Sequence, residues 1–354
     1  MFNIYIPKID FNTYKLKELS PLIRPFVNEN GLFENNDNAK ERWGVELTTN
    51  LTSDFQTAQV ALFPYPLESM AVNIPEKDLF FELKDKCVTQ GITLICYVAG
   101  DFGALYPSYK NVVYFRNGGF NSGLDKNNHI FPFLLADHLK GILNKDEIEV
   151  RNKSEKLVIG FCGHASRGLV KRFYENLKFM KINLLRLRKG DFSFEPIFPS
   201  AFKRASILQH LEKDSRITCN FIYRENYRGG SRTPEEKAKT TLEYYENMFH
   251  SDYILCLRGA GNFSVRFFET LMLGRVPILI DTDVKLVDLE MGDNWNNHIF
   301  KVDISRVQEL SKLVLEFHSE LDNETFRTMQ KNNRDLFARM MKLDQYYKVS
   351  FEHV

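Results

Sequence analysis

The chain has 354 residues and a formal net charge of +1, from 47 basic and 46 acidic side chains. Because one hydrophobic core stops growing below this length, we expect two domains. Hydrophobic residues make up 44% of the chain and charged residues 26%, which is the balance of an ordinary folded protein. The near-zero charge excludes a global field that attracts nucleic acid, so no nucleic-acid partner is expected.

Neither the cysteines nor the apolar segments point to a secreted or membrane-spanning protein. The five cysteines are scattered, lie mostly in apolar runs and form no CxxC pair, which is typical of buried thiols in a reducing compartment. The N-terminal residues lack a basic segment followed by a long apolar one, and no window of about 18 apolar residues occurs. We therefore expect a cytoplasmic protein without a membrane span, and leave a peripheral association with membranes open.

The first half alternates short apolar runs with helix-like segments, which predicts a parallel sheet covered by helices. A polar stretch at residues 145–156, KDEIEVRNKSEK, interrupts this pattern, so residues 1–152 are the predicted first domain. The apolar runs are FNIYIP, AQVALFPYP, ITLICYV and NVVYF, beginning at Phe2, Ala58, Ile92 and Asn111.

The second half repeats the alternation, and residues 153–335 are the predicted second domain. A helix is predicted over residues 234–250, because Thr233, Pro234 and Glu236 supply an N-cap, a first-turn proline and a capping box. The amphipathic segment from residue 322 onward is expected to pack back toward the first domain through residues 336–354. Strands are expected at KLVIGFCG, ITCNFIY, DYILCLR, VPILID and HIFKVD, beginning at Lys156, Ile217, Asp252, Val276 and His298.

The clearest chemical signal lies in residues 251–283. A strand ending at Arg258 is followed by a loop whose backbone N–H groups can approach a ligand closely, because it contains glycines. Ser264 is the expected N-cap of a helix over residues 265–273, and the free N–H groups of such a helix favour an anion. We therefore predict a phosphate site. The loop residues are Gly259, Ala260, Gly261 and Asn262.

Charged side chains flank this loop. Arg258 and Arg266 are the predicted diphosphate ligands, because a guanidinium gives charge and two parallel donors together. Glu269, three residues after Arg266, lies on a neighbouring part of the helix face and suits two ribose hydroxyls. The alternative is a structural ion-pair cluster made by the same three residues. Gly274 is expected to end the helix.

These motifs resemble the C-terminal domain of the exostosin-like glycosyltransferases. The matching residues are Arg258-Gly259, then the run S-V-R-F-F-E from Ser264 to Glu269, and then G-R-V-P-I from Gly274. The turn GFCGHASRGLVKRF from Gly160 is also similar to that family. The resemblance implies an α/β GT-B fold, in which two Rossmann-like domains face a cleft. It also implies a nucleotide-sugar donor on the C-terminal domain, an acceptor on the N-terminal domain, inversion at the anomeric carbon and no obligatory metal.

The expected function is therefore glycosyl transfer from a nucleotide-diphosphate sugar, with UDP favoured, to a hydroxyl of a glycan or glycolipid acceptor. A role in cell-surface polysaccharide or glycoconjugate synthesis follows from the resemblance alone, and no cofactor is expected. One alternative is a fucosyltransferase-like enzyme that uses a GDP-sugar. Another is a non-catalytic protein of the same fold that binds a nucleotide-sugar or carbohydrate. A Rossmann-type oxidoreductase is disfavoured, because no strand is followed by GxGxxG with an acidic residue at the expected distance.

An inverting transfer needs a base that takes the proton of the acceptor hydroxyl. Asp101 is the candidate, because it directly follows the apolar run ITLICYVAG, where a strand end meets a loop. A local turn formed by residues 100–103 is an equally good explanation of this aspartate.

Further donor contacts are predicted at two other strand ends. His164 and Arg167, in the glycine-bearing turn after a strand, are candidates for the diphosphate, with a plain surface role as the alternative. Arg224 and Arg228 follow another strand and are candidate donor contacts, or else part of a solvated basic loop. Asp281 is expected to form a turn and to contact a sugar hydroxyl. Although Asp281 and Asp283 form a DxD pattern, a lone DxD is a weak signal and no metal site is expected.

Overall fold

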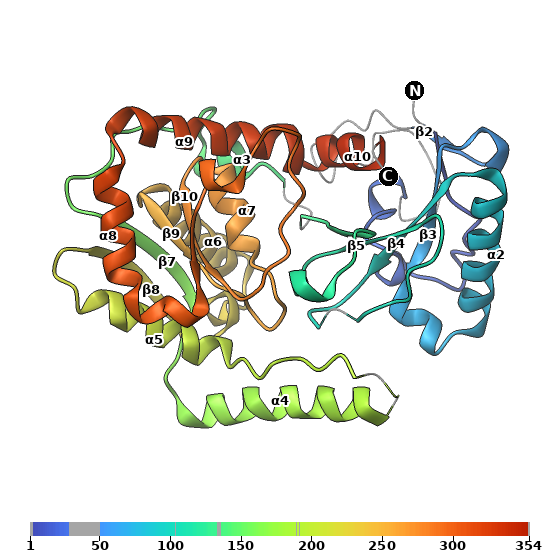
Figure 1. Ribbon diagram of the computed structural model, residues 1–354, viewed down its shortest axis with the longest axis horizontal. Coiled ribbons are helices and arrows are strands. Elements are labelled where there is room, and N and C mark those ends of the chain that lie inside the picture. Colours follow the sequence, from blue (N-terminus) through green and yellow to red (C-terminus); the bar gives the residue numbers. More distant parts are fainter. Residues whose placement is uncertain are drawn as a thin grey trace. The chain divides into compact units, whose positions relative to one another are not determined.

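The chain folds into two compact α/β units. Unit 1 comprises Met1–Ala136, Lys285–Asp288 and Arg339–Val354, and unit 2 comprises Asp137–Val284 and Leu289–Ala338. Each unit has its own parallel sheet, which is compatible with two Rossmann-like domains (Figure 1). The computed structural model describes residues 3–27, 50–102, 104–132, 136–188, 190 and 192–352.

Unit 1 is built on a six-stranded sheet. Its strands are β1 (Asn3–Tyr5), β2 (Asn50–Thr52), β3 (Val60–Pro66), β4 (Thr93–Val98), β5 (Val112–Arg116) and β6 (Asn128–Ile130). They pair in the order β2-β1-β3-β4-β5-β6, and every pair is parallel. The inner strands β3 and β4 are buried along almost their whole length, as their continuous apolar sequence requires.

Helix α2 (Ile74–Gln90) is the longest helix among the described residues of unit 1, and it packs on β3 and β4 (Figure 1). Its N-cap Asn73 accepts a hydrogen bond from the backbone N–H of Glu76, and Gly91 ends it in the left-handed conformation at φ 76°. Short 3-10 helices connect the strands at η1 (Leu16–Glu18), η2 (Arg24–Phe26), η3 (Phe55–Thr57), η4 (Leu67–Ala71) and η5 (Asn121–Gly123).

The C-terminal helix α10 (Leu343–Glu352) belongs to unit 1. The hydroxyl of Tyr346 donates to the carbonyl oxygen of Ile130 at 2.7 Å, and that of Tyr347 donates to Leu22 at 2.6 Å. Tyr346 also packs edge-on against Phe115 of β5. Aromatic packing and buried hydroxyl bonds therefore tie the end of the chain to the first sheet.

Unit 2 is built on a five-stranded sheet. Its strands are β7 (Val158–His164), β8 (Thr218–Arg224), β9 (Tyr253–Cys256), β10 (Val276–Asp281) and β11 (Phe300–Asp303). They pair in the order β11-β10-β9-β7-β8, again entirely in parallel. The strands expected from the five apolar runs of the second half are thus all confirmed. The sheet has the doubly wound order 2-1-3-4-5, so its topological switch point lies between β7 and β9.

Helices cover both faces of this sheet. One group, α3 (His138–Leu143), α6 (Pro234–Phe249), α7 (Val265–Met272) and α9 (Asn323–Leu336), includes direct contacts of α6 with β7 and of α7 with β9. The other group is α4 (Leu169–Arg188), α5 (Ser200–Glu212) and α8 (Leu310–Glu320). Shorter turns are η6 (Tyr227–Gly230), η7 (Trp295–Asn297), η8 (Ile304–Glu309) and the π-helical turn η9 (Phe337–Met341).

Two helix ends show why these segments form where they do. The side chain of Thr233 accepts from the backbone N–H of Glu236, and the carboxylate of Glu236 accepts from the backbone N–H of Thr233. The predicted capping box of α6 is therefore confirmed. Gly274 follows α7 at φ 62°, and the backbone N–H of Arg275 donates to the carbonyl of Thr270 at 2.9 Å. The expected glycine stop is confirmed, and the helix proper ends one residue early, at Met272.

The two units meet along the chain at residue 137, whereas the sequence places the boundary after residue 152. The intervening residues are held to the rest of unit 2 by contacts that include three with partners far along the chain. Arg275 donates to the carbonyl of Glu149 at 3.0 Å, and the Gln330 amide donates to the carbonyl of Arg151 at 2.7 Å. Arg334 pairs with Asp137 at 2.6 Å. The partners are distant in sequence, so the polar composition of residues 145–156 does not reveal these contacts.

The cores are apolar and hold the cysteines. All five cysteines are free thiols, and four of them are buried, while Cys219 is partly buried. Burial raises the pKa of the Cys87 and Cys256 thiols to about 12, because a thiolate is poorly solvated there. Within the described residues, no helix is long and apolar enough to span a membrane.

Candidate functional site

The switch point of the second sheet brings together two of the predicted diphosphate contacts, His164 and Arg266. Ligands of open parallel sheets bind beyond the carboxyl ends of the strands, where neighbouring strands connect in opposite directions. In unit 2 this is the edge at which β7 ends in His164 and β9 leads into Arg258. Three basic side chains converge there: His164 itself, Arg204 from α5 and Arg266 from the first turn of α7. Together with Tyr244 of α6 we name them the β7–β9 edge cluster.

Arg204 spans the two strand ends. Its Nη1 donates to the carbonyl oxygen of His164 at 3.2 Å, and its Nη2 donates to that of Arg258 at 3.0 Å. Burial, together with the nearby charge of Arg266, lowers the pKa of Arg204 to about 10, so the group stays charged at neutral pH. Sequence reasoning missed this residue, because nothing in the helix that carries it distinguishes Arg204 from its basic neighbours Lys203 and His210.

Arg266 lies against β7 from the other side. Its Nη2 donates to the carbonyl oxygen of Cys162 at 2.8 Å, and its guanidinium stacks 4.3 Å from the ring of Phe161. The guanidinium also lies 5.6 Å from the ring of Tyr244. This approach requires a glycine, because a Cβ atom at position 163 would stand 2.6 Å from Nη2.

The electrostatics of this edge favour an anion. Within the described part of the chain, no carboxylate forms an ion pair with Arg204 or Arg266, and Glu175 acts on Arg204 only at longer range. The pKa of His164 is lowered by burial, and further by the charges of Lys171 and Arg204. Its Nε2 is buried without a hydrogen-bond partner among the described residues. Two partly buried guanidiniums without an acid partner leave positive charge that an anion would balance.

Glu269 is buried beside the cluster, with 8% of its surface exposed. Both carboxylate oxygens are engaged, since Oε2 accepts from the hydroxyl of Tyr244 and Oε1 from that of Tyr245 at 2.8 Å. Burial and the negative charge of Glu269 raise the pKa of both tyrosines well above the usual value. Burial also lowers the pKa of His138, whose ring packs on Tyr245. Glu269 thus fixes the position of Tyr244, whose ring faces Arg266.

Arg258 points away from this edge into protein. Only 2% of its surface is exposed, its guanidinium lies 5.0 Å from the ring of Phe198, and Nη2 donates to the carbonyl of Ala260 at 2.7 Å. Glu195 lies 3.9 Å from the same nitrogen. The main-chain oxygen of Arg258, rather than its side chain, contacts the edge cluster, because it accepts a hydrogen bond from Arg204. The side chain of Arg258 therefore has a structural role, but the alternative ion-pair cluster of Arg258, Arg266 and Glu269 does not form between these described side chains, because Glu195 is the carboxylate near Arg258 and Glu269 accepts from two tyrosines.

The glycine loop is braced from within. Asn262 is buried and donates to the carbonyls of Thr282 and Asp283 at 3.0 and 2.9 Å, so it ties the loop to the end of β10. The N–H of Gly259 closes the loop on the carbonyl of Phe263 at 3.3 Å, and Gly261 is buried. The packed loop therefore gives α7 a fixed start.

Ser264 and Asp281 flank this loop in partly buried positions. Ser264 occupies the N-cap of α7, as predicted, but its hydroxyl makes no capping bond. Asp281 forms the expected turn by accepting from the N–H of Val284 at 2.9 Å, and it pairs with Lys301 at 3.1 Å. Among the described residues, no group of three or more His, Cys, Asp or Glu side chains is arranged to hold a metal ion.

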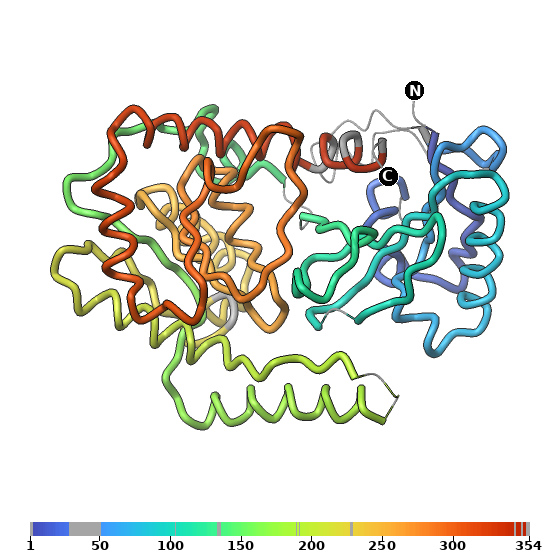
Figure 2. The backbone as a smooth tube through the Cα atoms, in the orientation of Figure 1, coloured from blue at the N-terminus to red at the C-terminus, as the bar shows by residue number. Residues whose placement is uncertain are grey.

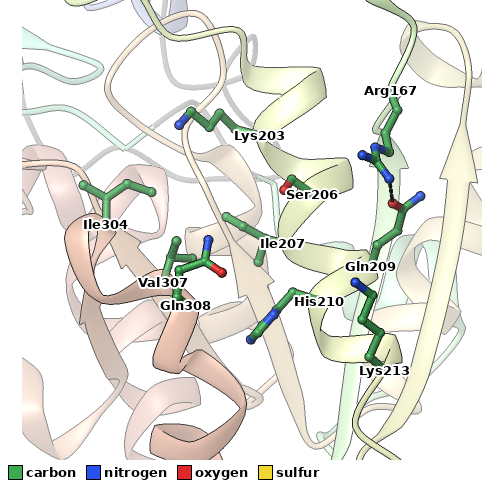
Figure 3. Close-up of a pocket in the computed structure, with 10 residues that line it drawn as sticks. All are labelled: Arg167, Lys203, Ser206, Ile207, Gln209, His210, Lys213, Ile304, Val307 and Gln308. Carbon is green, nitrogen blue, oxygen red and sulfur yellow. Dashed lines mark hydrogen bonds between the residues drawn. The ribbon is translucent and has the colours of Figure 1, made fainter.

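Arg167 lines a separate basic pocket between α5 and η8 (Figure 3). Its Nη1 donates to the side-chain oxygen of Gln209 at 2.8 Å. The pocket encloses about 220 Å³, and no carboxylate is among its described lining residues. Arg167 therefore does not join His164, although only two residues separate them. The basic lining residues besides Arg167 are Lys203, His210 and Lys213.

The remaining basic candidates follow β8. Arg224 ends that strand, donates to the carbonyl of Thr240 at 2.6 Å and pairs with Glu243 at 2.8 Å. It therefore braces β8 against α6. Arg228 lies in η6, and its side chain is outside the described part of the structure.

Unit 1 holds two carboxylates near the end of β4. Asp101 is exposed in the turn after Gly100, which takes φ 85°, and Gly103 lies outside the described residues. Glu68 of η4 is partly buried, and its Oε2 accepts from the N–H of Ala99 at 2.9 Å. Its Oε1 is buried without a hydrogen-bond partner among the described residues, and burial raises its pKa. Sequence reasoning missed Glu68, because it lies in a short turn without a motif.

No protein-family model matches the chain, and no curated protein matches it.

Proposed function

We propose that the chain is a glycosyltransferase that binds a nucleoside-diphosphate sugar at the β7–β9 edge cluster. The donor's diphosphate would lie against Arg204 and Arg266, with the imidazole of His164 beside it. The resemblance of the motifs in residues 160–173 and 258–278 to exostosin-like glycosyltransferases is consistent with this proposal, as is the pair of parallel α/β units that a GT-B fold requires. UDP is the favoured nucleotide and a glycan hydroxyl the favoured acceptor.

One observation carries the proposal. Arg204 and Arg266 form no ion pair with any described residue, although both lie partly buried at the switch point of a doubly wound sheet. Withdrawing a cation from water is costly unless a counter-charge compensates it, so such a pair favours an anionic ligand. A diphosphate suits two guanidiniums, because each can donate two parallel hydrogen bonds to phosphate oxygens. The same donors would stabilise the charge that develops on the leaving nucleotide.

Glu269 enters this proposal mainly as a positioning residue. Its carboxylate would reach a ribose hydroxyl only by giving up the bond from Tyr244 or Tyr245. Holding Tyr244 against Arg266 is the role that its present contacts support.

The acceptor hydroxyl must lose a proton during transfer. Of the two carboxylates near the end of β4, Glu68 is our first candidate for the general base. Burial raises its pKa, and base catalysis at neutral pH is most efficient when the pKa of the base lies near the operating pH. Asp101 remains the alternative, and substitution of each by its amide separates them. Loss of turnover with retained donor binding in only one of the two variants would identify the base.

Calorimetric titration with UDP, GDP, CMP and NAD tests the proposal directly. We expect one diphosphate nucleotide to bind, and Arg204→Met or Arg266→Met to weaken it about 10- to 100-fold, since a hydrogen bond to a charged group contributes about 1.5–3 kcal/mol. The matched control is Arg216→Met, which removes an exposed arginine paired with Asp214. If no nucleotide binds, or if all three variants behave alike, the proposed donor site is wrong. Binding without turnover on any acceptor would instead indicate a non-catalytic nucleotide-sugar protein.

A further inference from the structure

Helix α4 displays an apolar face to solvent rather than to its own core. Figures 1 and 2 show α4 standing apart from the sheet of unit 2, with the segment that follows it alongside. Phe179 is the buried residue of this 20-residue helix. Residues spaced by three and four along it form one continuous stripe, which we name the α4 apolar face. The stripe is Leu169, Phe173, Leu177, Met180, Leu184 and Leu187, each between 40% and 71% exposed.

The apolar face is broad and is extended by neighbouring side chains. Val170, Tyr174 and Leu185 lie beside the stripe and are also exposed. At 100° per residue, the nine side chains occupy about 160° of the helix circumference, which is wider than the apolar stripe of an ordinary surface helix. Apolar patches of this kind mark interaction surfaces.

The segment after α4 adds to the same surface. Its chain is fixed to the helix, because Asn183 exchanges two hydrogen bonds with the backbone of Glu195 at 2.8 and 2.9 Å, and Arg186 donates to the carbonyl of Ser193. These bonds hold the segment in a defined position beside the helix. Its exposed apolar residues are Phe192, Phe194 and Ile197.

The charge of α4 identifies the kind of partner. The helix carries six basic residues and one acidic residue, a net charge of +5. The whole chain has a net charge of +1, so everything outside this helix sums to −4. Lys181 and Arg188 are exposed and lie at the angular positions of the apolar face, where their stems can cover apolar surface while their charges extend outward.

We propose that the α4 apolar face and its basic residues bind the surface of an anionic phospholipid bilayer. A basic amphipathic helix with exposed leucine and phenylalanine lies in the interfacial plane of a membrane, with its apolar side chains at the acyl boundary and its cations among the head groups. A second copy of the chain fits less well, because it would bring a charge of +5 against another of +5. The inference does not depend on the proposed glycosyl transfer.

Sedimentation of the full-length protein with vesicles tests this inference. We expect binding to vesicles that contain about 30–40% phosphatidylglycerol, because their negative surface attracts the basic residues of α4. Binding to vesicles of pure phosphatidylcholine should be weak. Lys181→Gln with Arg188→Gln should weaken the binding about thirtyfold, because each cation near an anionic surface contributes about 1 kcal/mol. Phe173→Ser with Leu177→Ser and Leu184→Ser should abolish it.

Matched variants separate this surface from a general effect of charge or apolarity. Lys237→Gln with Lys239→Gln removes two exposed lysines of α6, and Val72→Ser with Ile74→Ser removes two exposed apolar residues of unit 1. Both controls should bind vesicles like the unaltered protein. Equal binding by all variants, or none by the unaltered protein, overturns the inference. So does sedimentation velocity showing a dimer that only the Phe173, Leu177 and Leu184 variant dissociates, because the face would then bind a second copy.

Discussion

A Cβ atom added to Gly163 would stand 2.6 Å from Nη2 of Arg266, so the absence of a side chain at one strand end lets the arginine reach the carbonyl of Cys162. Gly163 does not need a left-handed backbone, since its φ is not positive. Its role is therefore steric, and it makes room for a cation at the switch point of the second sheet.

Gly163→Ala should displace the Arg266 guanidinium without unfolding the protein. The atom it meets is the free end of a flexible side chain, so we expect the free energy of unfolding to change by less than about 1.5 kcal/mol. The affinity for the diphosphate nucleotide should fall about tenfold, because one charged hydrogen-bond donor moves. Thermal unfolding and calorimetry measure the two effects. An unchanged affinity would show that the placement of Arg266 does not matter to the ligand.

His164 predicts a pH dependence of both stability and binding. The pKa of His164 in the folded chain is below 6.5, the usual value that applies to the unfolded chain. As the pH falls below 6.5, the unfolded chain therefore takes up a proton before the folded chain does, and the free energy of unfolding decreases. An anion beside the imidazole raises its pKa, so binding takes up a proton and the affinity increases as the pH falls. The total gain, reached once the pH is below the pKa of His164 in the free protein, is about tenfold for each unit by which the anion raises that pKa. Calorimetry of the nucleotide-sugar in buffers of different ionisation enthalpy measures this uptake. His164→Gln should remove it, and persistence of the uptake in that variant would assign it to another group.

The motif-bearing part of this site could be predicted from the sequence because its structure is local. The strand, the loop from Gly259, the start of α7 at Val265 and the stop at Gly274 each depend on residues within a few positions of one another. Likewise, the apolar runs predicted nearly all of the strands that the structure describes, among which only the short strands β2 and β6 lack a clear run. Local propensity and burial agree in these segments.

Side-chain direction could not be predicted, because it is decided by partners far away in sequence. Arg258 follows the strand as expected, but Phe198 and Glu195 draw its guanidinium into the protein. Arg204 contacts the ends of β7 and β9 from helix α5, which lies outside the motif-bearing segment, and no sequence motif marks it. The exposure of the α4 apolar face could not be predicted from the sequence either, since the spacing of its apolar residues is also that of a helix packed against a core.

Glu68→Gln should increase the stability of the protein at neutral pH. Burial raises the pKa of Glu68 in the folded chain above the value near 4.5 that it has in the unfolded chain. At a pH between these two pKa values, the carboxyl group is ionised in the unfolded chain but still protonated in the folded chain. Rising pH through this window therefore destabilises the natural protein, and the amide removes that cost while retaining an acceptor for the N–H of Ala99. Chemical denaturation at pH 4 and pH 8 measures the difference, which should be near zero at the lower pH. A variant that is less stable at pH 8 would show that the carboxylate is held charged by its surroundings.

Gly274→Ala tests the turn that sets α7 against β10. Gly274 takes φ 62°, and a Cβ there would lie 2.6 Å from Cδ1 of Ile148 and 2.9 Å from the carbonyl oxygen of Gln330. The left-handed conformation costs a residue with a side chain about 1 kcal/mol, and the contact with a backbone oxygen cannot be relieved by a side-chain rotation, so the free energy of unfolding should fall by more than about 2 kcal/mol. Gly91→Ala is the matched control, because Gly91 ends α2 at φ 76° and a Cβ added there would meet nothing within 4 Å. It should lose only about 1 kcal/mol, and an equal loss in both variants would mean that backbone strain alone, rather than the crowding by Ile148 and Gln330, requires glycine after α7.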